Sequence, residues 1–181
     1  INSEGPLDAT NCTFNNNRAY YEGGAICSYG ELQATGCTFS NNNTEYGGAI
    51  CSYGELQTIG CSFNNNNAES GGAIVNEEGT LNTTGCTFSN NSAYYWGGAI
   101  VNMEATTTVD SCLFINNRAT TQEEAYGGAI YTSIFQDKKN GGTYQSSHTV
   151  YVYNSTFIGN SALYNGGALA NLDDAAYLTG C

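Results

Sequence analysis

The sequence predicts an all-β, single-stranded parallel β-helix, a solenoid of about seven coils with about 24 residues per coil. The first observation is a Gly-Gly-Ala-Ile tetrapeptide that occurs five times, with Gly-Gly-Ala-Leu as a sixth copy, at residues 23–26, 47–50, 71–74, 97–100, 127–130 and 166–169. The second is a Phe-x-x-Asn element that precedes each copy. The third is the lack of helical periodicity in any window. A regular period of this size without helical patterning is typical of a stacked repeat protein.

One coil can be followed from Ile74 to Phe88. Ile74 and Val75 begin a first strand after the Gly-Gly bend, and the next four residues, Asn-Glu-Glu-Gly, form a turn. Residues 80–84 form a second strand, and Gly-Cys-Thr-Phe leads into a third strand before an Asn-Asn corner. Strands of about three to five residues between Gly and Asn corners are too short for a meander of hairpins. Each unit is therefore expected to be one coil with three short strands.

Stacking the coils places equivalent residues above one another at about 4.8 Å. The Ile residues then form one interior column and the Phe residues another. The Asn that ends each Phe-x-x-Asn element forms a third column, whose amides can donate and accept along the stack. Satisfying these amides avoids a cost of about 1–3 kcal/mol for each buried group. This structural ladder consists of Asn17, Asn42, Asn66, Asn91, Asn117 and Asn160.

The charge balance excludes several classes of partner. Sixteen acidic residues stand against four basic ones, a formal net charge of −12. Nucleic acid is a poor partner because phosphate contacts need clusters of Lys and Arg, and an anionic membrane surface is disfavoured for the same reason. No apolar run approaches the roughly 18 residues of a membrane span. We therefore expect an extracellular or cell-surface location, where an acidic surface resists nonspecific association.

The chain is expected to be a single β-helix segment over residues 1–181, with coil insertions at 120–126 and 132–149. Both ends fall within a coil, because Ile1 aligns with Val75, and Cys181 aligns with the cysteines that precede the Phe positions. An uncapped coil offers unpaired strand edges. We expect either that the chain belongs to a longer protein or that its copies stack end to end.

The linked Gly-Gly-Ala-Ile and Phe-x-x-Asn elements resemble the repeats of chlamydial polymorphic outer-membrane proteins and of adhesin-like surface proteins of methanogens and bacteria. Six linked pairs, from Phe14 to Leu169, carry the resemblance. It implies a right-handed β-helix that is displayed on a cell surface and used in adhesion. The last repeat departs from the pattern, since Gly159 replaces the first Asn of its pair. We assign Asn154 as the replacement for the column cysteine of that repeat.

The eight cysteines fall into two columns. No CxxC pair with accompanying His residues is present, so we expect no zinc site. Cys27 and Cys51 follow successive Gly-Gly-Ala-Ile copies and are the disulfide candidates, because a spacing of about 4.8 Å suits a bridge. The longer column is expected either to form bridges or to remain a stack of buried thiols; its members are Cys12, Cys37, Cys61, Cys86, Cys112 and Cys181.

Aromatic residues gather just before the Gly-Gly bends, and stacking should set many of them along one edge. Such a stripe can lie against sugar rings or anchor a protein partner. The alternative is that the rings shield one another and the bend beneath them. The candidate binding residues for a glycan or a host or cell-surface protein are Tyr21, Tyr46, Tyr95, Trp96 and Tyr126.

Two acidic positions could attract a cation. Glu31 and Glu55 are equivalent residues one coil apart, with Glu78 nearby, and a Ca²⁺ ion could relieve their repulsion, although splaying into solvent is the commoner outcome. We otherwise expect no metal and no cofactor.

Asn82 heads the sequon that is best placed for glycosylation.

Catalysis is not expected, although some parallel β-helices are polysaccharide lyases or hydrolases. The acidic pairs at 77–78, 123–124 and 173–174 are adjacent at turns, where side chains diverge, and His148 has no evident nucleophile. We predict a non-catalytic surface-display or adhesin-like segment that binds glycans or proteins. The alternative is a subunit of an extracellular filament built by end-to-end stacking, and a minor alternative is a polysaccharide lyase or hydrolase.

Overall fold

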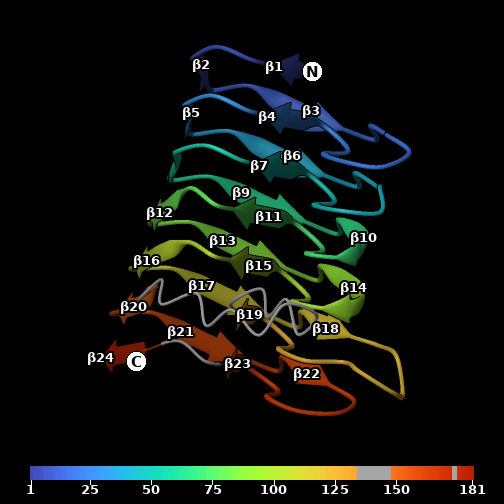
Figure 1. Ribbon diagram of the computed structural model, residues 1–181, viewed down its shortest axis with the longest axis vertical. Coiled ribbons are helices and arrows are strands. Elements are labelled where there is room, and N and C mark those ends of the chain that lie inside the picture. The colour runs from blue at the N-terminus through green and yellow to red at the C-terminus, as the bar shows by residue number, and fades with distance from the viewer. Residues whose placement is uncertain (134–147, 173–174) are drawn as a thin grey trace, which may run out of the picture.

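The computed structural model describes residues 1–133, 148–172 and 175–181, and these residues form a parallel β-helix. The coils follow one another in sequence order along the long axis, with the N-terminus at one end and the C-terminus at the other (Figure 1). Neighbouring strands run parallel in each sheet. The predicted fold class is confirmed.

Four sheets run along the axis. The first sheet contains β1 (Asn2–Ser3), β4 (Ile26–Ser28), β7 (Ile50–Ser52), β11 (Ile74–Glu77), β15 (Ile100–Met103), β19 (Ile130–Ser133) and β23 (Leu169–Leu172). The second contains β2 (Leu7–Thr10), β5 (Leu32–Thr35), β8 (Leu56–Ile59), β12 (Thr80–Thr84), β16 (Thr106–Asp110), β20 (Thr149–Tyr153) and β24 (Ala175–Thr179). The third contains β3 (Thr13–Asn15), β6 (Thr38–Ser40), β9 (Ser62–Asn64), β13 (Thr87–Ser89), β17 (Leu113–Ile115) and β21 (Thr156–Ile158). The fourth contains β10 (Asn67–Ser70), β14 (Ser92–Trp96), β18 (Arg118–Ala119) and β22 (Ser161–Ala162).

The described chain makes about six turns, close to the seven that the repeat count predicts. The fourth sheet differs from the three-strand coil expected from the sequence. It forms because the residues that follow each ladder Asn also pair with the next coil, as in the contact of β10 with β14. In the first coils this side is reduced to isolated bridges, such as that between Arg18 and Asn43. The fourth sheet therefore begins at β10 and continues through β14 and β18 to β22.

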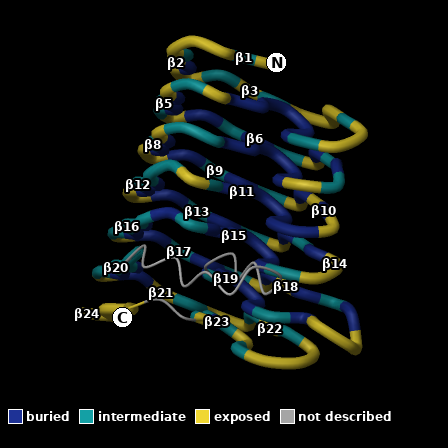
Figure 2. The backbone as a smooth tube through the Cα atoms, in the orientation of Figure 1, coloured by how far each residue is buried: buried dark blue, intermediate teal, exposed yellow. Residues whose placement is uncertain are grey.

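The interior is built from columns in which the same or a similar side chain recurs in successive coils. Ile50 pairs with Ile74 in the first sheet, Leu56 with Leu81 in the second, and Phe63 with Phe88 in the third. The six Phe rings stack with centroids 4.7–4.9 Å apart and planes within 3–7° of parallel. Figure 2 shows the buried residues along the inner stretches of every middle coil, while the exposed ones collect at the corners. Burying each of these large side chains contributes about 1.5–3 kcal/mol.

The two residues of the Asn-Asn corner have different structural roles. The first Asn adopts a left-handed conformation, with φ of 55° at Asn65 and Asn90. Asn tolerates this region better than most residues, and Gly does so without penalty. This explains why Gly159, at φ 61°, can replace the first Asn in the last repeat. The second Asn turns inward to the ladder.

The Gly-Gly pair is required by close contact between coils. Gly97 has a φ of 56°. A Cβ on Gly98 would lie 2.1 Å from the carbonyl oxygen of Gly128 in the next coil, so no side chain fits there. The repeat therefore preserves both glycines, the first for its backbone conformation and the second for its contact.

The assignment of Asn154 to the cysteine column is wrong. Ser155 occupies the column, and its Oγ accepts a hydrogen bond of 3.0 Å from the backbone N–H of Cys112. Cys112 has the same role in the preceding coil, where its sulfur accepts from the N–H of Cys86 at 3.4 Å. Asn154 instead has a φ of 48° and occupies the turn position before the column, equivalent to Gly85. Counting back two residues from Phe157 reveals this register.

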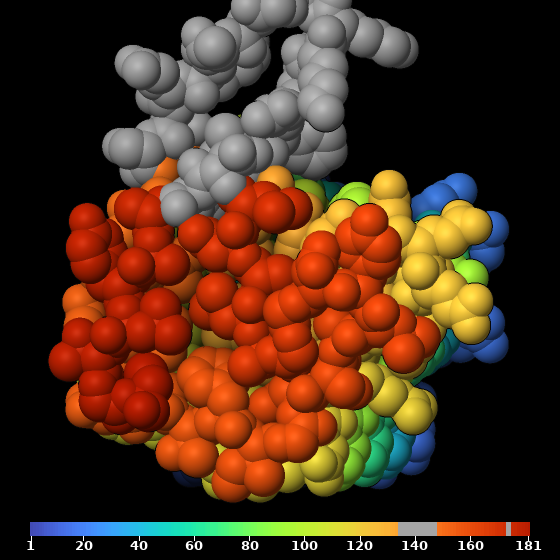
Figure 3. All heavy atoms as spheres, turned by 90° about the horizontal axis from the view of Figure 1, so that it is seen from below, coloured from blue at the N-terminus to red at the C-terminus, as the bar shows by residue number. Residues whose placement is uncertain are grey.

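The first of the two predicted insertions projects from the stack. Residues 120–126 project beyond the outline of the last coil in the end-on view, where they are coloured yellow (Figure 3). They rejoin the stack at Tyr126, which bridges to Trp96 on one side and Asn165 on the other. The insertion expected at 132–149 lies between β19 and β20, and its residues 134–147 lie outside the described residues.

Candidate functional site

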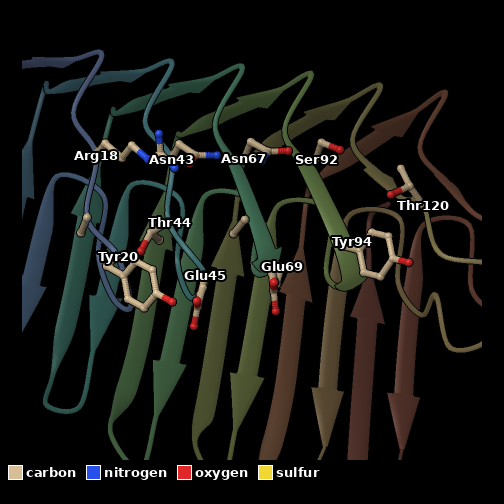
Figure 4. Close-up of a pocket in the computed structure, with 12 residues that line it drawn as sticks. Arg18, Tyr20, Asn43, Thr44, Glu45, Asn67, Glu69, Ser92, Tyr94 and Thr120 are labelled. Carbon is tan, nitrogen blue, oxygen red and sulfur yellow. The ribbon is translucent and has the colours of Figure 1, made fainter.

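A polar groove crosses the coils on the side of the fourth sheet. Two rows of side chains border it (Figure 4), and its volume is about 370 Å³. One row consists of Arg18, Asn43, Asn67 and Ser92, and the other of Tyr20, Glu45, Glu69 and Tyr94, with Thr120 at one end. Each of four successive coils contributes one residue to each row, so the groove runs across these coils.

The groove exists because small residues form its floor. Ala19, Thr44 and Ala68 follow the ladder Asn by two positions and lie between the two rows. Thr44 and Ala68 are buried, with exposed fractions of 6% and 3%. Side-chain directions alternate along a strand, so the residues on either side of each small residue point outward and become the walls.

The groove carries mixed charge and two exposed aromatic rings. Arg18 is its basic residue, and Glu45 and Glu69 are its acidic ones. Tyr20 and Tyr94 are 72% and 51% exposed, far more than an aromatic residue that serves only packing. The arrangement offers donors and acceptors between two rings, which suits a polar ligand with flat apolar faces.

The five predicted binding residues do not form one stripe. In the position before each Gly-Gly pair the structure aligns Glu22, Tyr46, Ser70, Trp96, Tyr126 and Asn165, so polar residues interrupt the aromatic ones. Tyr21 and Tyr95 lie one position earlier, and their rings meet Tyr20 and Tyr94 edge to face at centroid distances of 4.5 and 4.6 Å. They support the groove rings rather than line the groove.

Tyr46 and Trp96 line a second hollow, over the outer face of the first sheet. Its volume is about 300 Å³, and its lining consists of Glu22, Tyr46, Cys51, Tyr53, Val75, Glu77, Trp96 and Met103. Tyr126 packs beside this hollow against Tyr131, which also stacks on Trp96 at 5.5 Å. The predicted stripe is thus divided between the rim of the groove, this hollow and an aromatic cluster.

Cys27 and Cys51 lie directly opposite each other on β4 and β7, at the edge of the second hollow. They are free thiols in the structure, and the described residues contain no disulfide. The pKa of Cys51 is raised, first because its thiol donates toward Cys27 and second by burial. The Glu22 carboxylate accepts hydrogen bonds from the Tyr53 hydroxyl at 2.7 Å and from the Tyr29 hydroxyl at 3.3 Å, and it thereby links these two side chains.

The ladder asparagines line the corner between the third and fourth sheets. Asn66 shows the pattern: its Oδ1 accepts from the backbone N–H and the Nδ2 of Asn42, at 3.0 and 2.9 Å. Its Nδ2 donates to Asn91 Oδ1 and to the Phe39 carbonyl, both at 3.0 Å. The same bonds link the column from Asn17 to Asn160. These residues are fully engaged in structure.

The remaining predicted positions lie apart from both hollows. Asn82 points outward at intermediate exposure in the middle of β12. Glu55, Glu78, Glu104 and His148 border a shallow hollow of about 360 Å³. Within the described residues, no three His, Cys, Asp or Glu side chains come together as a metal site. Glu31 is not among the residues that border this hollow.

Sequence reasoning missed the polar groove, although a signal for it was present. Residues one and three positions after each ladder Asn from Asn17 to Asn117 are polar or aromatic, and the residue between them is small, as in Asn67-Ala68-Glu69. This is the period-two pattern of a strand with one buried face. The pattern is only three residues long in each coil, and it becomes visible when the coils are aligned.

A comparison with protein families matches the chain five times to the Chlamydia polymorphic membrane protein repeat, at residues 11–29, 36–53, 85–102, 111–133 and 154–171. These matches cover just over half of the chain. No curated protein and no solved structure shows significant similarity to it. In the described residues, no helix has the length and apolar character to cross a membrane. The matched segments contain the repeated corners, interior columns and glycine contacts described above. The chain belongs to the family of Chlamydia polymorphic membrane protein repeats.

Proposed function

We propose that this β-helix is a surface-displayed adhesin segment and that its polar groove binds a neutral glycan chain. The family is one of surface proteins that are not enzymes, which supports display at the cell surface. The observation that carries the proposal is the groove itself, with two exposed Tyr rings and a row of amide, hydroxyl and carboxylate groups between them.

The spacing of the groove suits a linear oligosaccharide. Tyr20 and Tyr94 are three strand spacings apart, roughly 14 Å. Between them, Asn43 and Asn67 present one amide per coil, and Glu45 and Glu69 one carboxylate per coil. An extended sugar chain presents hydroxyl groups at a similar repeat along its edge and apolar ring faces at its ends. A protein partner would need a larger surface, typically about 800 Å² on each side.

The charge of the groove favours neutral glycans over sulfated ones. Glu45 and Glu69 outnumber Arg18, and the whole chain carries a formal charge of −12. A sulfated chain would meet both local carboxylates and the long-range negative field. Hydroxyl groups, by contrast, can donate to these carboxylates and accept from the amides.

The lyase or hydrolase alternative gains no support from the groove. Glycoside hydrolysis needs one carboxylic acid kept protonated by an apolar environment and a second carboxylate that stays ionised. Glu69 is exposed and Glu45 is half-buried, and both border an open polar groove. They are better placed to accept hydrogen bonds from a bound ligand.

The test is a binding measurement with defined oligosaccharides. Isothermal titration calorimetry with neutral β-linked tetrasaccharides, cellotetraose and chitotetraose, is compared with a sulfated tetrasaccharide. We expect binding of a neutral chain that weakens about tenfold, or about 1.4 kcal/mol, in Tyr20→Ala and in Tyr94→Ala. Tyr177→Ala, at an exposed Tyr on β24, serves as the matched control and should bind as the unmodified chain does. Preferential binding of the sulfated chain, or equal loss in all three variants, would contradict the proposal.

A further inference from the structure

The second hollow has the composition of an aromatic cage. Three aromatic side chains line it, Tyr46, Tyr53 and Trp96, together with the Met103 side chain and two carboxylates. Its floor is the outer face of the first sheet, where Cys51 and Val75 are buried at 0% and 1% exposure. These floor residues belong to an apolar cluster separate from the interior of the coil.

The hollow arises from a difference in size between neighbouring coils. Ser70 stands between Tyr46 and Trp96 in one column, because it pairs with Trp96 in the fourth sheet and bridges to Tyr46. The backbone positions of Tyr46 and Trp96 are therefore two strand spacings apart, roughly 9–10 Å. Ser70 is much smaller than the aromatic residue on either side of it, so its coil leaves space between Tyr46 and Trp96.

The hollow is acidic as well as apolar. Glu22 lies at one end and Glu77 beside the floor. Burial raises the pKa of Glu77, and the neighbouring carboxylates of Glu78, Glu104 and Glu22 raise it further. In the part of the chain that the structure describes, no basic side chain lines the hollow. A positive charge is thus the missing partner of these two carboxylates.

We propose that this hollow binds a trimethylammonium group of the choline type. A cation is attracted to an aromatic face within about 6 Å of the ring centre. A cation midway between Tyr46 and Trp96 would lie roughly 5 Å along the axis from the strand of each residue, which is compatible with that reach. Val75, Cys51 and Met103 offer apolar contact to the methyl groups, while Glu22 and Glu77 balance the charge.

A quaternary ammonium fits the site better than the ammonium of a Lys side chain. A primary ammonium is a compact, strongly hydrated charge with three donors, each of which needs an acceptor. Here the Glu22 carboxylate already accepts from Tyr53, Tyr29 and Cys27. A trimethylammonium group needs no hydrogen-bond acceptor and loses little on entering an apolar lining. This inference is independent of glycan binding in the polar groove, because the two hollows share no residue.

Trp96 makes the test direct, because it is the single tryptophan of the chain. Its fluorescence is followed while choline chloride is added, with sodium chloride at equal ionic strength as the salt control. The second titrant is 3,3-dimethylbutan-1-ol, which has the shape of choline without the charge. We expect a saturable change with choline and none with the alcohol. An equal response to both, or no response to choline, would overturn the proposal.

Substitutions then separate the charge from the ring. Glu77→Gln should weaken choline binding about tenfold, whereas Glu55→Gln, which removes the same charge outside this hollow, should change it less than twofold. Tyr46→Leu should weaken binding by a similar factor, and Tyr46→Phe, which keeps the ring, should not. Thermal unfolding of each variant establishes that it is folded. Equal effects of Glu77→Gln and Glu55→Gln would count against the site.

A third comparison identifies the source of the headgroup. Free choline is compared with vesicles of phosphatidylcholine, and vesicles of phosphatidylglycerol serve as the control. Tighter binding of free choline supports a soluble cation as ligand, and selective binding of phosphatidylcholine vesicles supports a lipid headgroup. Binding of phosphatidylglycerol vesicles to the same extent would refute recognition of the cation.

Discussion

Replacing Asn66 by Ala tests whether the asparagine ladder stabilises the stack. The Asn66 side chain makes four hydrogen bonds, two as acceptor and two as donor, and it is fully buried. Asn66→Ala removes all four. Among the described residues, the backbone N–H of Asn42 has no other hydrogen-bond acceptor and becomes a buried, unsatisfied donor. The backbone N–H of Asn66 keeps its bond to Asn91.

The magnitude follows from this count. A buried hydrogen bond contributes about 0.5–1.5 kcal/mol net, and leaving a buried donor unpaired costs about 1–3 kcal/mol. Four lost bonds therefore predict a destabilisation of about 4 kcal/mol. For a chain of this size, that corresponds to a fall in Tm of roughly 10 °C.

Asn17→Ala provides a graded control at the start of the same ladder. The Asn17 side chain is exposed and makes a single ladder bond, from its Nδ2 to Asn42 Oδ1 at 2.9 Å. Its loss should cost about 1 kcal/mol or less. Equilibrium unfolding in urea, followed by circular dichroism, compares the two variants with the unmodified chain. If Asn66→Ala were no more destabilising than Asn17→Ala, the ladder would not be a source of stability.

Three further outcomes are expected. Gly98→Ala should prevent stable stacking, because its Cβ would lie 2.1 Å from the Gly128 carbonyl oxygen. At Gly85 an added Cβ would have no atom within 4 Å, so Gly85→Ala should cost only about 1–2 kcal/mol, from its φ of 61°. Size-exclusion chromatography and urea unfolding of the two variants measure this difference. Iodoacetamide should label the exposed Cys181 in the native protein, whereas the buried Cys37, Cys61, Cys86 and Cys112 should react only in denaturant. Mass spectrometry identifies the labelled residues. Labelling of these four thiols without denaturant would argue against their packed column. Burial raises the pKa of Glu77, so the folded state loses stability as pH rises from the unfolded value of about 4.3 through the folded pKa. The Glu77→Gln variant should therefore be more stable than the unmodified chain above about pH 4.3 and equally stable at lower pH. Thermal unfolding of both proteins as a function of pH is the measurement. Parallel pH profiles would show that folding does not raise the pKa of Glu77.

The interior of the coil could be predicted from sequence because each interior position repeats. Phe63 and Phe88, for example, can form a stack at 4.7 Å only if the coils are in register, and a register shift would break every column at once. The same logic located the ladder asparagines and the Gly-Gly bends. It failed at Asn154, where the loss of the cysteine removed the local marker and Ser155 took its place in the column.

The two hollows could not be predicted in the same way, because outward positions do not repeat. The second hollow depends on Ser70 being smaller than Tyr46 and Trp96, its neighbours one coil away on either side. Tyr95 and Trp96 are adjacent in the chain, but Trp96 lines the second hollow whereas Tyr95 packs on Tyr94, and sequence proximity does not show this difference. Repetition along the chain by itself determined the fold, since in-register stacking places equivalent interior residues of successive coils above one another. Only the tertiary structure decided where ligands can bind, since a hollow is a difference between coils that are about 24 residues apart.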